Sequence, residues 1–120
     1  MRSDMLVSIL SDLNGASADI EATAIISTDG LTMASVLPAS MDEDRVGAMS
    51  AAMLSLGDRT AQELVRGELE QVLIKGDSGY VLMAYAGKEA VLTVLAKPNA
   101  KLGLIFLDVK RAASSIAELL

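Results

Sequence analysis

The chain of 120 residues contains no cysteine, no histidine and no tryptophan. Without cysteine there are no disulfides and no thiol nucleophile, and without histidine the commonest catalytic base is missing. Both absences together remove the usual zinc ligands. The residues left for chemistry are carboxylate pairs and Ser114-Ser115, and no sequence motif activates them. We therefore expect no enzyme, no cofactor and no metal site.

Aromatic residues are scarce as well, since Tyr80, Tyr85 and Phe106 are the only ones, and the net charge is −6. Nucleic-acid binding needs basic stripes and aromatic platforms for stacking, so we expect no nucleic-acid partner. The acidic balance disfavours anionic membrane surfaces, and it suits either a basic partner face or simple solubility. No stretch is long enough to cross a bilayer, and the N-terminal residues lack the pattern of a signal peptide. These features predict a cytoplasmic protein without direct membrane insertion.

Hydrophobic residues make up 52% of the chain. This fraction is above the usual range of about 45–50%, which also counts glycine. A length of 120 residues is typical of one domain, so we treat residues 1–120 as a single domain. Because a small domain has much surface for its volume, self-association is the simplest way to bury the surplus.

Periodicity and turn signals divide the chain into eight elements. The predicted helices are residues 3–14, residues 42–65 and a last helix that follows Lys97-Pro98-Asn99; the predicted strands are residues 20–27, 31–36, 68–75, 79–86 and 89–96. The order α-β-β-α-β-β-β-α predicts an α+β fold with a sheet between helices. The last two strands are almost entirely apolar, which favours a central position in the sheet.

Short motifs indicate how these elements are joined. Asp29-Gly30 is typical of a hairpin turn, since glycine adopts a positive φ at no steric cost. Ser40 and Glu43 have the spacing of a capping box at the start of the long helix. Asn14-Gly15 is typical of a helix end. Gly76–Gly79 and Gly87-Lys88 lead into strands, so they predict hairpins, whereas a phosphate loop leads into a helix.

The long helix has more apolar residues than one contact face requires. They form two stripes, Val46, Met49, Met53, Leu56 and Leu64 in one and Ala51, Leu54, Ala61 and Val65 in the other. One stripe is enough to cover a sheet. Small residues between the stripes, Gly47, Ala48, Ala52 and Gly57, suggest close approach by a second helix. We therefore expect this helix to contact both its own sheet and another molecule.

Residues 68–75 follow the long helix and begin the run of three strands, so this strand is expected at a sheet edge. An exposed edge is either blocked by charge, as Glu68 and Glu70 suggest, or paired with another chain. Antiparallel pairing with a second copy requires opposed residue numbers to have an even sum. An axis at Glu70 would oppose like charges, at a cost of up to about 1 kcal/mol. We expect pairing, with the axis near Gln71 or Val72.

Three arginines of the long helix, Arg45, Arg59 and Arg66, are separated by multiples of seven and are expected along one edge. Such a face is either solvated or used to dock a partner, because arginine is enriched at interfaces. The spacing alone leaves both interpretations open.

Four segments, residues 24–35, 46–59, 66–74 and 102–113, follow one another in an order that resembles the Roadblock/dynein light chain family, in particular its MglB-like bacterial branch. They are the Ser-Thr-Asp-Gly-Leu hairpin, the Ala- and Met-rich helix ending in Leu56-Gly57-Asp58-Arg59, Arg66-Gly67-Glu68-Leu69-Glu70, and Lys101-Leu102-Gly103-Leu104 before an amphipathic helix. No single segment is specific, but their order and spacing are.

The resemblance implies a five-stranded antiparallel sheet, with the long helix on one face and the first and last helices on the other. It also implies a homodimer joined into a continuous sheet through the third strand and second helix, which binds a Ras-like small GTPase. The expected dimer interface is Met49, Met53, Leu54, Leu69, Gln71, Val72, Leu73 and Ile74. The expected GTPase-docking surface is Arg45, Arg59, Gln62, Glu63 and Arg66. A small-ligand sensor and a structural subunit of a larger assembly remain alternatives.

Overall fold

A computed structural model describes residues 1–120. Its elements are α1 (Arg2–Ala16), β1 (Ile20–Ser27), β2 (Thr32–Val36), α2 (Glu43–Glu63), β3 (Gln71–Gly76), β4 (Gly79–Ala86), β5 (Ala90–Ala96) and α3 (Leu102–Leu119). The five strands form one antiparallel sheet in the order β2-β1-β5-β4-β3. The predicted α+β fold class and element order are confirmed. β5 is the central strand and is flanked by β1 and β4, so both strands predicted to be central lie inside the sheet, and β3 lies at an edge.

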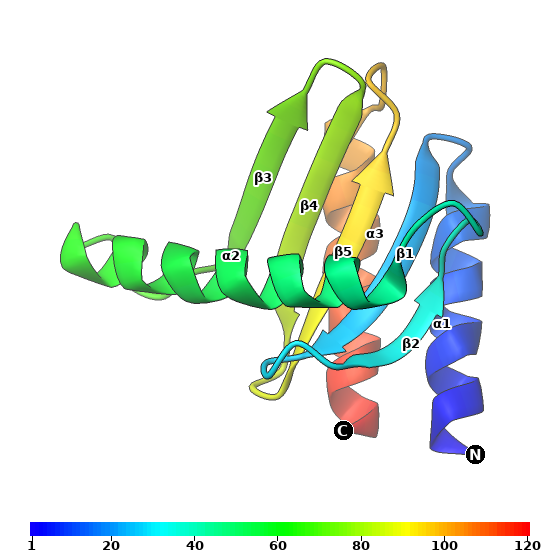
Figure 1. The fold of residues 1–120 in the computed structure, drawn as a ribbon, viewed down its shortest axis with the longest axis horizontal. Coiled ribbons are helices and arrows are strands. Elements are labelled where there is room, and N and C mark those ends of the chain that lie inside the picture. The colour runs from blue at the N-terminus through cyan, green and yellow to red at the C-terminus, as the bar shows by residue number, and fades with distance from the viewer.

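Helices cover the two faces of the sheet unequally (Figure 1). On one face α2 packs over a small cluster that includes Ala24, Leu54 and Met83. On the other face α1 and α3 lie side by side over the larger cluster, which includes Leu10, Leu92 and further buried residues of α3. No helix is long and apolar enough to cross a membrane.

Alternation along the strands decides which residues face which helix. On β5, Leu92 and Val94 face α1 and α3, whereas Val91 faces α2. Thr93 also faces α2, where its Oγ1 donates to Oγ of Ser50 at 2.8 Å. Both side chains are buried, so this hydrogen bond satisfies two polar groups inside the contact between helix and sheet.

The β1–β2 hairpin turns at Asp29-Gly30 as predicted, with Gly30 at φ +92°. The same turn packs against the first half of α2. A Cβ built on Gly47 would lie 2.6 Å from the carbonyl oxygen of Gly30. Gly47 is therefore required by the contact of α2 with its own hairpin and does not serve a second helix.

The long helix begins where predicted, but its capping and the end of α1 differ from the prediction. The N-cap of α2 is Asp42, whose Oδ1 accepts hydrogen bonds from the backbone N–H groups of Asp44 and Arg45. Glu43 instead accepts a hydrogen bond from the hydroxyl of Ser35 on β2, so the Ser40 capping box does not form. Helix α1 continues past Asn14 to Ala16. The Asn14 side chain accepts a 2.7 Å hydrogen bond from Thr23 on β1, which ties helix to sheet.

The connection between α2 and β3 also differs from the prediction. The helix ends at Glu63, and the strand starts at Gln71, three residues later than predicted. Val65 turns the chain with a φ of 57°, and the N–H of Arg66 reaches back to the carbonyl of Ala61. This is a Schellman-type helix end that carries valine where glycine is usual.

Candidate protein-interaction surfaces

β3 is a free sheet edge, and its two sets of side chains lie on different faces of the sheet. Val72 pairs with Met83 of β4, so Val72 and Ile74 lie on the α2 face. Leu73 pairs with Leu82, so Gln71, Leu73 and Lys75 lie on the α3 face. Leu73 and Ile74 are 40% and 39% exposed. An apolar strand edge of this kind can pair with another strand.

The C-terminal half of α2 extends past β3 into solvent (Figure 1). One of the two predicted apolar stripes lies along the border between the buried and exposed sides of α2, and its Val46 packs against the cluster beneath the helix. Met49, Leu56 and Leu64 are exposed, and Met53 is half-buried. Exposed leucine and methionine side chains in one row are typical of a helix that packs against a further surface.

An open groove lies on the α2 face, between the first half of α2 and strands β3 to β5. Its volume is about 410 Å³. Its apolar lining is Met41, Val46, Met49, Met53, Ile74, Val81, Met83 and Leu95. Methionines suit such a surface because their unbranched, polarizable side chains adapt to irregular partners. The groove is continuous with the exposed residues of β3.

The other predicted stripe does not form a second surface. Leu54 is 1% exposed and packs in the core cluster beneath α2, so it is not part of an interface with another molecule. Gly57 also faces the sheet, since a Cβ at this position would lie 2.9 Å from Cγ2 of Val72. Leu69 lies in the same contact and is half-buried. The small residues Gly47 and Gly57 thus bring α2 close to its own sheet.

The predicted docking residues lie along and beyond α2. Nε of Arg59 donates to Oε1 of Glu63 at 3.1 Å, and the amide of Gln62 donates to Asp58 at 3.4 Å. All of these pairs are exposed, so they contribute little to folding stability. The side chains are therefore ordered along one turn of helix and remain open to solvent.

The predicted common edge of three arginines was wrong. Arg66 lies after the end of α2, and its Nε donates to the carbonyl of Leu64. Arg45 lies near the helix start and lines the α2-face groove. Fourteen residues separate Arg45 from Arg59, or about 21 Å along the helix axis. The structure brings Arg59, Gln62 and Glu63 together and leaves Arg45 apart.

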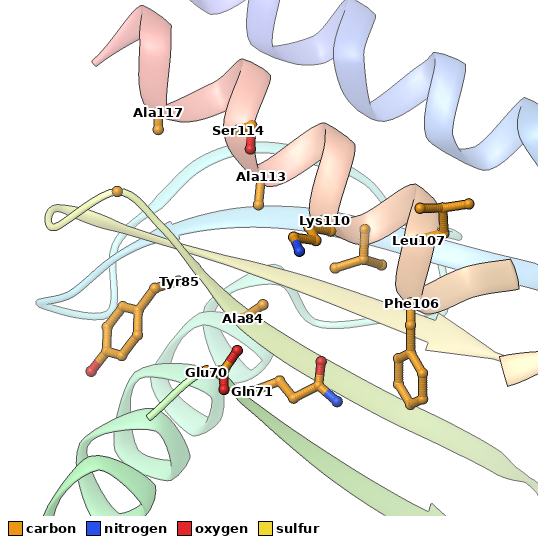
Figure 2. A pocket seen from close by; sticks show the side chains of 12 residues that line it. Glu70, Gln71, Ala84, Tyr85, Phe106, Leu107, Lys110, Ala113, Ser114 and Ala117 are labelled. Carbon is orange, nitrogen blue, oxygen red and sulfur yellow. The ribbon is translucent and has the colours of Figure 1, made fainter. Parts of the chain in front are cut away.

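A second groove was missed by sequence reasoning. It lies on the opposite face, between α3 and the edge of the sheet, and has a volume of about 570 Å³. Figure 2 shows Phe106, Lys110 and Ala113 of α3 on one side and Glu70 and Gln71 on the other. The excess of leucines on α3 was a possible signal, because Leu104 and Leu107 are exposed.

Tyr85 of β4 borders this groove, but its side chain points to the other face of the sheet, where it packs against the cluster beneath α2 (Figure 2). Burial raises the pKa of its phenol, and the nearby Asp58 carboxylate raises the pKa further. Both causes disfavour the phenolate, so Tyr85 stays protonated wherever the protein is near neutral pH.

Comparisons with known proteins agree with this geometry. The Roadblock/LC7 domain family matches residues 6–96. The protein MJ0310 of Methanocaldococcus jannaschii is 42% identical over 112 residues, which cover 93% of this chain and 96% of that protein. The solved structure of MglB with tetrameric arrangement has a TM-score of 0.90 at 20% identity and covers 98% of this chain and 89% of its own. The Roadblock/LC7 domain of Streptomyces avermitilis has a TM-score of 0.88 at 21% identity, covering 93% and 94%. The chain belongs to the Roadblock/LC7 domain family.

Proposed function

We propose that two copies of this chain pair through β3 and α2, and that the dimer is a non-enzymatic regulator or scaffold that binds a Ras-like small GTPase in the cytoplasm. The observation that carries the proposal is the free apolar edge of β3 beside an α2 that extends past it. The GTPase is what the family resemblance implies.

A two-fold axis at the β3 edge explains both exposed features at once. It pairs β3 with β3 of the second copy and extends the sheet through both subunits. The half of α2 that projects past the edge then lies over the second copy, on the face where the open groove is. Leu56 and Leu64 supply apolar side chains for that groove, and Met49 and Met53 line it. Neither feature is satisfied within one chain.

The interface residues in this proposal are Met49, Met53, Leu69, Gln71, Val72, Leu73 and Ile74. Leu54 is left out because it is buried in its own subunit. Val72 and Leu69 contribute to this interface indirectly, because both are half-buried beneath α2 and hold the helix in place.

The docking surface in this proposal is the exposed polar part of α2 together with the residue that follows it: Arg45, Arg59, Gln62, Glu63 and Arg66. In a two-fold dimer the two α2 helices lie side by side, so both copies contribute to one platform. If the platform binds one nucleotide state of the GTPase more tightly than the other, it shifts the equilibrium between the two states by the difference in binding free energy.

The experiment that tests this function is a pull-down with the tagged chain from native lysate, in a non-hydrolysable GTP analogue and in GDP. We expect one small GTPase to be retained in one nucleotide state only. The purified GTPase is then titrated against wild-type protein, Arg59→Glu and the control Arg2→Glu on α1. Arg59→Glu should weaken binding about tenfold or more without unfolding, because its ion pair is exposed.

Equal affinity of both variants would remove Arg59 from the surface. Absence of any nucleotide-dependent partner would refute the GTPase part of the proposal.

The α2-face groove also supports a second candidate function, the binding of a small apolar ligand. Its volume of about 410 Å³ lies within the range of ligand sites, and Ser50 and Thr93 lie at its base. Native mass spectrometry separates the two functions. A bound small molecule in a monomer supports the sensor, whereas a ligand-free dimer supports the platform.

A further inference from the structure

The α3 face of the sheet is left partly uncovered at the β3 edge. α3 packs mainly on β4 and β5. The residues of β3 on this face therefore have no helix above them, and Leu73 remains 40% exposed. The groove of about 570 Å³ lies in this gap, and Gln71 and Ala84 form part of its floor.

The wall of the groove is one side of α3 (Figure 2). Phe106 is half-buried there, and Leu107 is 46% exposed. Further along the helix the wall is made of Ala113, Ser114 and Ala117. Large apolar side chains at one end and small ones at the other form a surface that another helix can approach closely.

The width of the groove follows from the proposed β3–β3 dimer, on which this inference rests. Strands in a sheet are about 4.8 Å apart, so three spacings place the two β4 strands about 14 Å apart and five place the two β5 strands about 24 Å apart. α3 lies over β4 and β5, and so the two α3 helices are separated by roughly 20 Å. Packed helices are about 8–10 Å apart. The gap therefore has room for one helix, in contact with both α3 helices and with β3 of both copies.

The charges around the gap are unlike those of the whole chain. Lys110 lines the groove, and Lys75 lies on the same face of β3, with its Nζ 6.0 Å from the centre of the Tyr80 ring. Glu70 is the acidic residue of the lining. Each copy thus contributes two lysines and one glutamate to a gap in a protein of net charge −6. An occupant with acidic flanks is complementary to this arrangement.

We propose that the groove between the two α3 helices holds one amphipathic helix of a partner protein, with an apolar stripe and acidic flanks, at one helix per dimer. The apolar stripe lies on Leu73 and Phe106 of both copies, and the flanks lie beside Lys75 and Lys110. This surface is on the opposite face of the sheet from α2, so it is separate from the GTPase platform.

The test uses a fluorescein-labelled peptide of about 21 residues, or roughly 31 Å of helix, with leucine at positions a and d and glutamate on the flanks. We expect saturable binding by fluorescence anisotropy at one peptide per two chains. Amide shifts in ¹⁵N NMR spectra should map to Leu73 and to residues 106–117. A peptide with lysine in place of glutamate should bind at least about tenfold more weakly.

Two exposed leucines of α3 provide matched variants. Leu107→Glu lies in the groove wall and should weaken peptide binding about tenfold or more, whereas Leu104→Glu lies outside the lining and should leave it unchanged. Equal effects of both variants, or equal binding of the basic peptide, would overturn the proposal.

The remaining outcomes separate this inference from the proposed dimer. A stable dimer that binds no peptide overturns the helix inference and leaves the dimer standing. A monomer that binds one peptide per chain overturns the dimer and, with it, the shared groove. A tetramer that Leu107→Glu dissociates would mean that a second dimer occupies the groove, which also overturns the proposal.

Discussion

Ile74→Glu provides a direct test of pairing through β3. Ile74 lies on the free edge and is 39% exposed in the single chain. Burying a whole isoleucine side chain contributes about 1.5–3 kcal/mol, so completing the burial of this one contributes roughly 1 kcal/mol per copy. The residue occurs twice at a two-fold interface, which doubles the effect to roughly 2 kcal/mol.

Electrostatic repulsion adds to this loss. With the axis at Val72, position 74 lies opposite position 70, but Glu70 lines the groove on the other face of the sheet, so no direct repulsion is expected. With the axis at Gln71, position 74 lies opposite Glu68 of the second copy. A glutamate at this position then opposes a like charge, at a cost of up to about 1 kcal/mol. This repulsion also occurs twice at a two-fold interface, so the total of roughly 2–4 kcal/mol predicts a dimer dissociation constant about 30- to 800-fold higher than that of the wild type.

Sedimentation equilibrium over a range of protein concentrations measures this change. Val7→Glu on α1 is the matched control, because Val7 is 40% exposed and lies away from the β3 edge. Circular dichroism checks that both variants remain folded. An unchanged dissociation constant for Ile74→Glu, or equal changes for both variants, would refute pairing through β3.

The absence of cysteine makes the axis itself measurable. Single cysteines at Gln71, Val72, Leu73 and Ile74 can be oxidised in turn, and the residue on the axis opposes its own copy. We expect the fastest cross-linking at Gln71 or Val72. Because β3 starts only at Gln71, an axis at Leu73 would pair Gln71 with Lys75 and keep the pairing within the observed strand. The rate of cross-linking at Leu73 is therefore the measurement to compare with those at Gln71 and Val72.

Two further predictions concern the segment around the end of α2. Val65 has a φ of 57°, a conformation that costs a β-branched residue about 1–2 kcal/mol, so Val65→Gly should raise the free energy of unfolding by about 1 kcal/mol in urea denaturation, and Val65→Ala should raise it less. The pKa of Tyr85 is raised above 10.0, first by burial and second by Asp58, so folding favours the protonated phenol. The stability that this contributes is complete below about pH 10 and is lost as the pH rises through the raised pKa. In a Tyr80→Phe background, tyrosinate absorbance should show that Asp58→Asn lowers the pKa of Tyr85; an unchanged pKa would contradict the proposed role of Asp58.

The sequence predicted the features that depend on local pattern. The Asp29-Gly30 turn, the apolar central strand β5 and the edge position of β3 all follow from residue type and order. The exposed row of Met49 and Leu56 also followed, because α2 carries more apolar residues than its contact with the sheet uses.

The sequence did not predict features that depend on tertiary contacts. The alternation in Glu68-Leu69-Glu70 resembles a strand, but Leu69 packs beneath Gly57 and pairing with β4 starts only at Gln71. The left-handed turn at Val65 places Arg66 outside α2, so the three arginines do not share one edge of a helix. This turn was not predicted, because β-branched residues rarely adopt a left-handed conformation. The α3 groove depends on where α3 lies over the sheet, which no local motif encodes.

The two faces of the sheet have different consequences for assembly through β3. On the α2 face, the proposed dimer would bring the projecting helix of each copy to the open groove of the other and so close that face. On the α3 face α3 packs on β4 and β5, and the same dimer would join two half-grooves into one. Pairing of a single edge strand would thus complete one surface and create another on the opposite side. If both proposals hold, the dimer would bind the GTPase on one face and a second protein on the other at the same time, as a scaffold must.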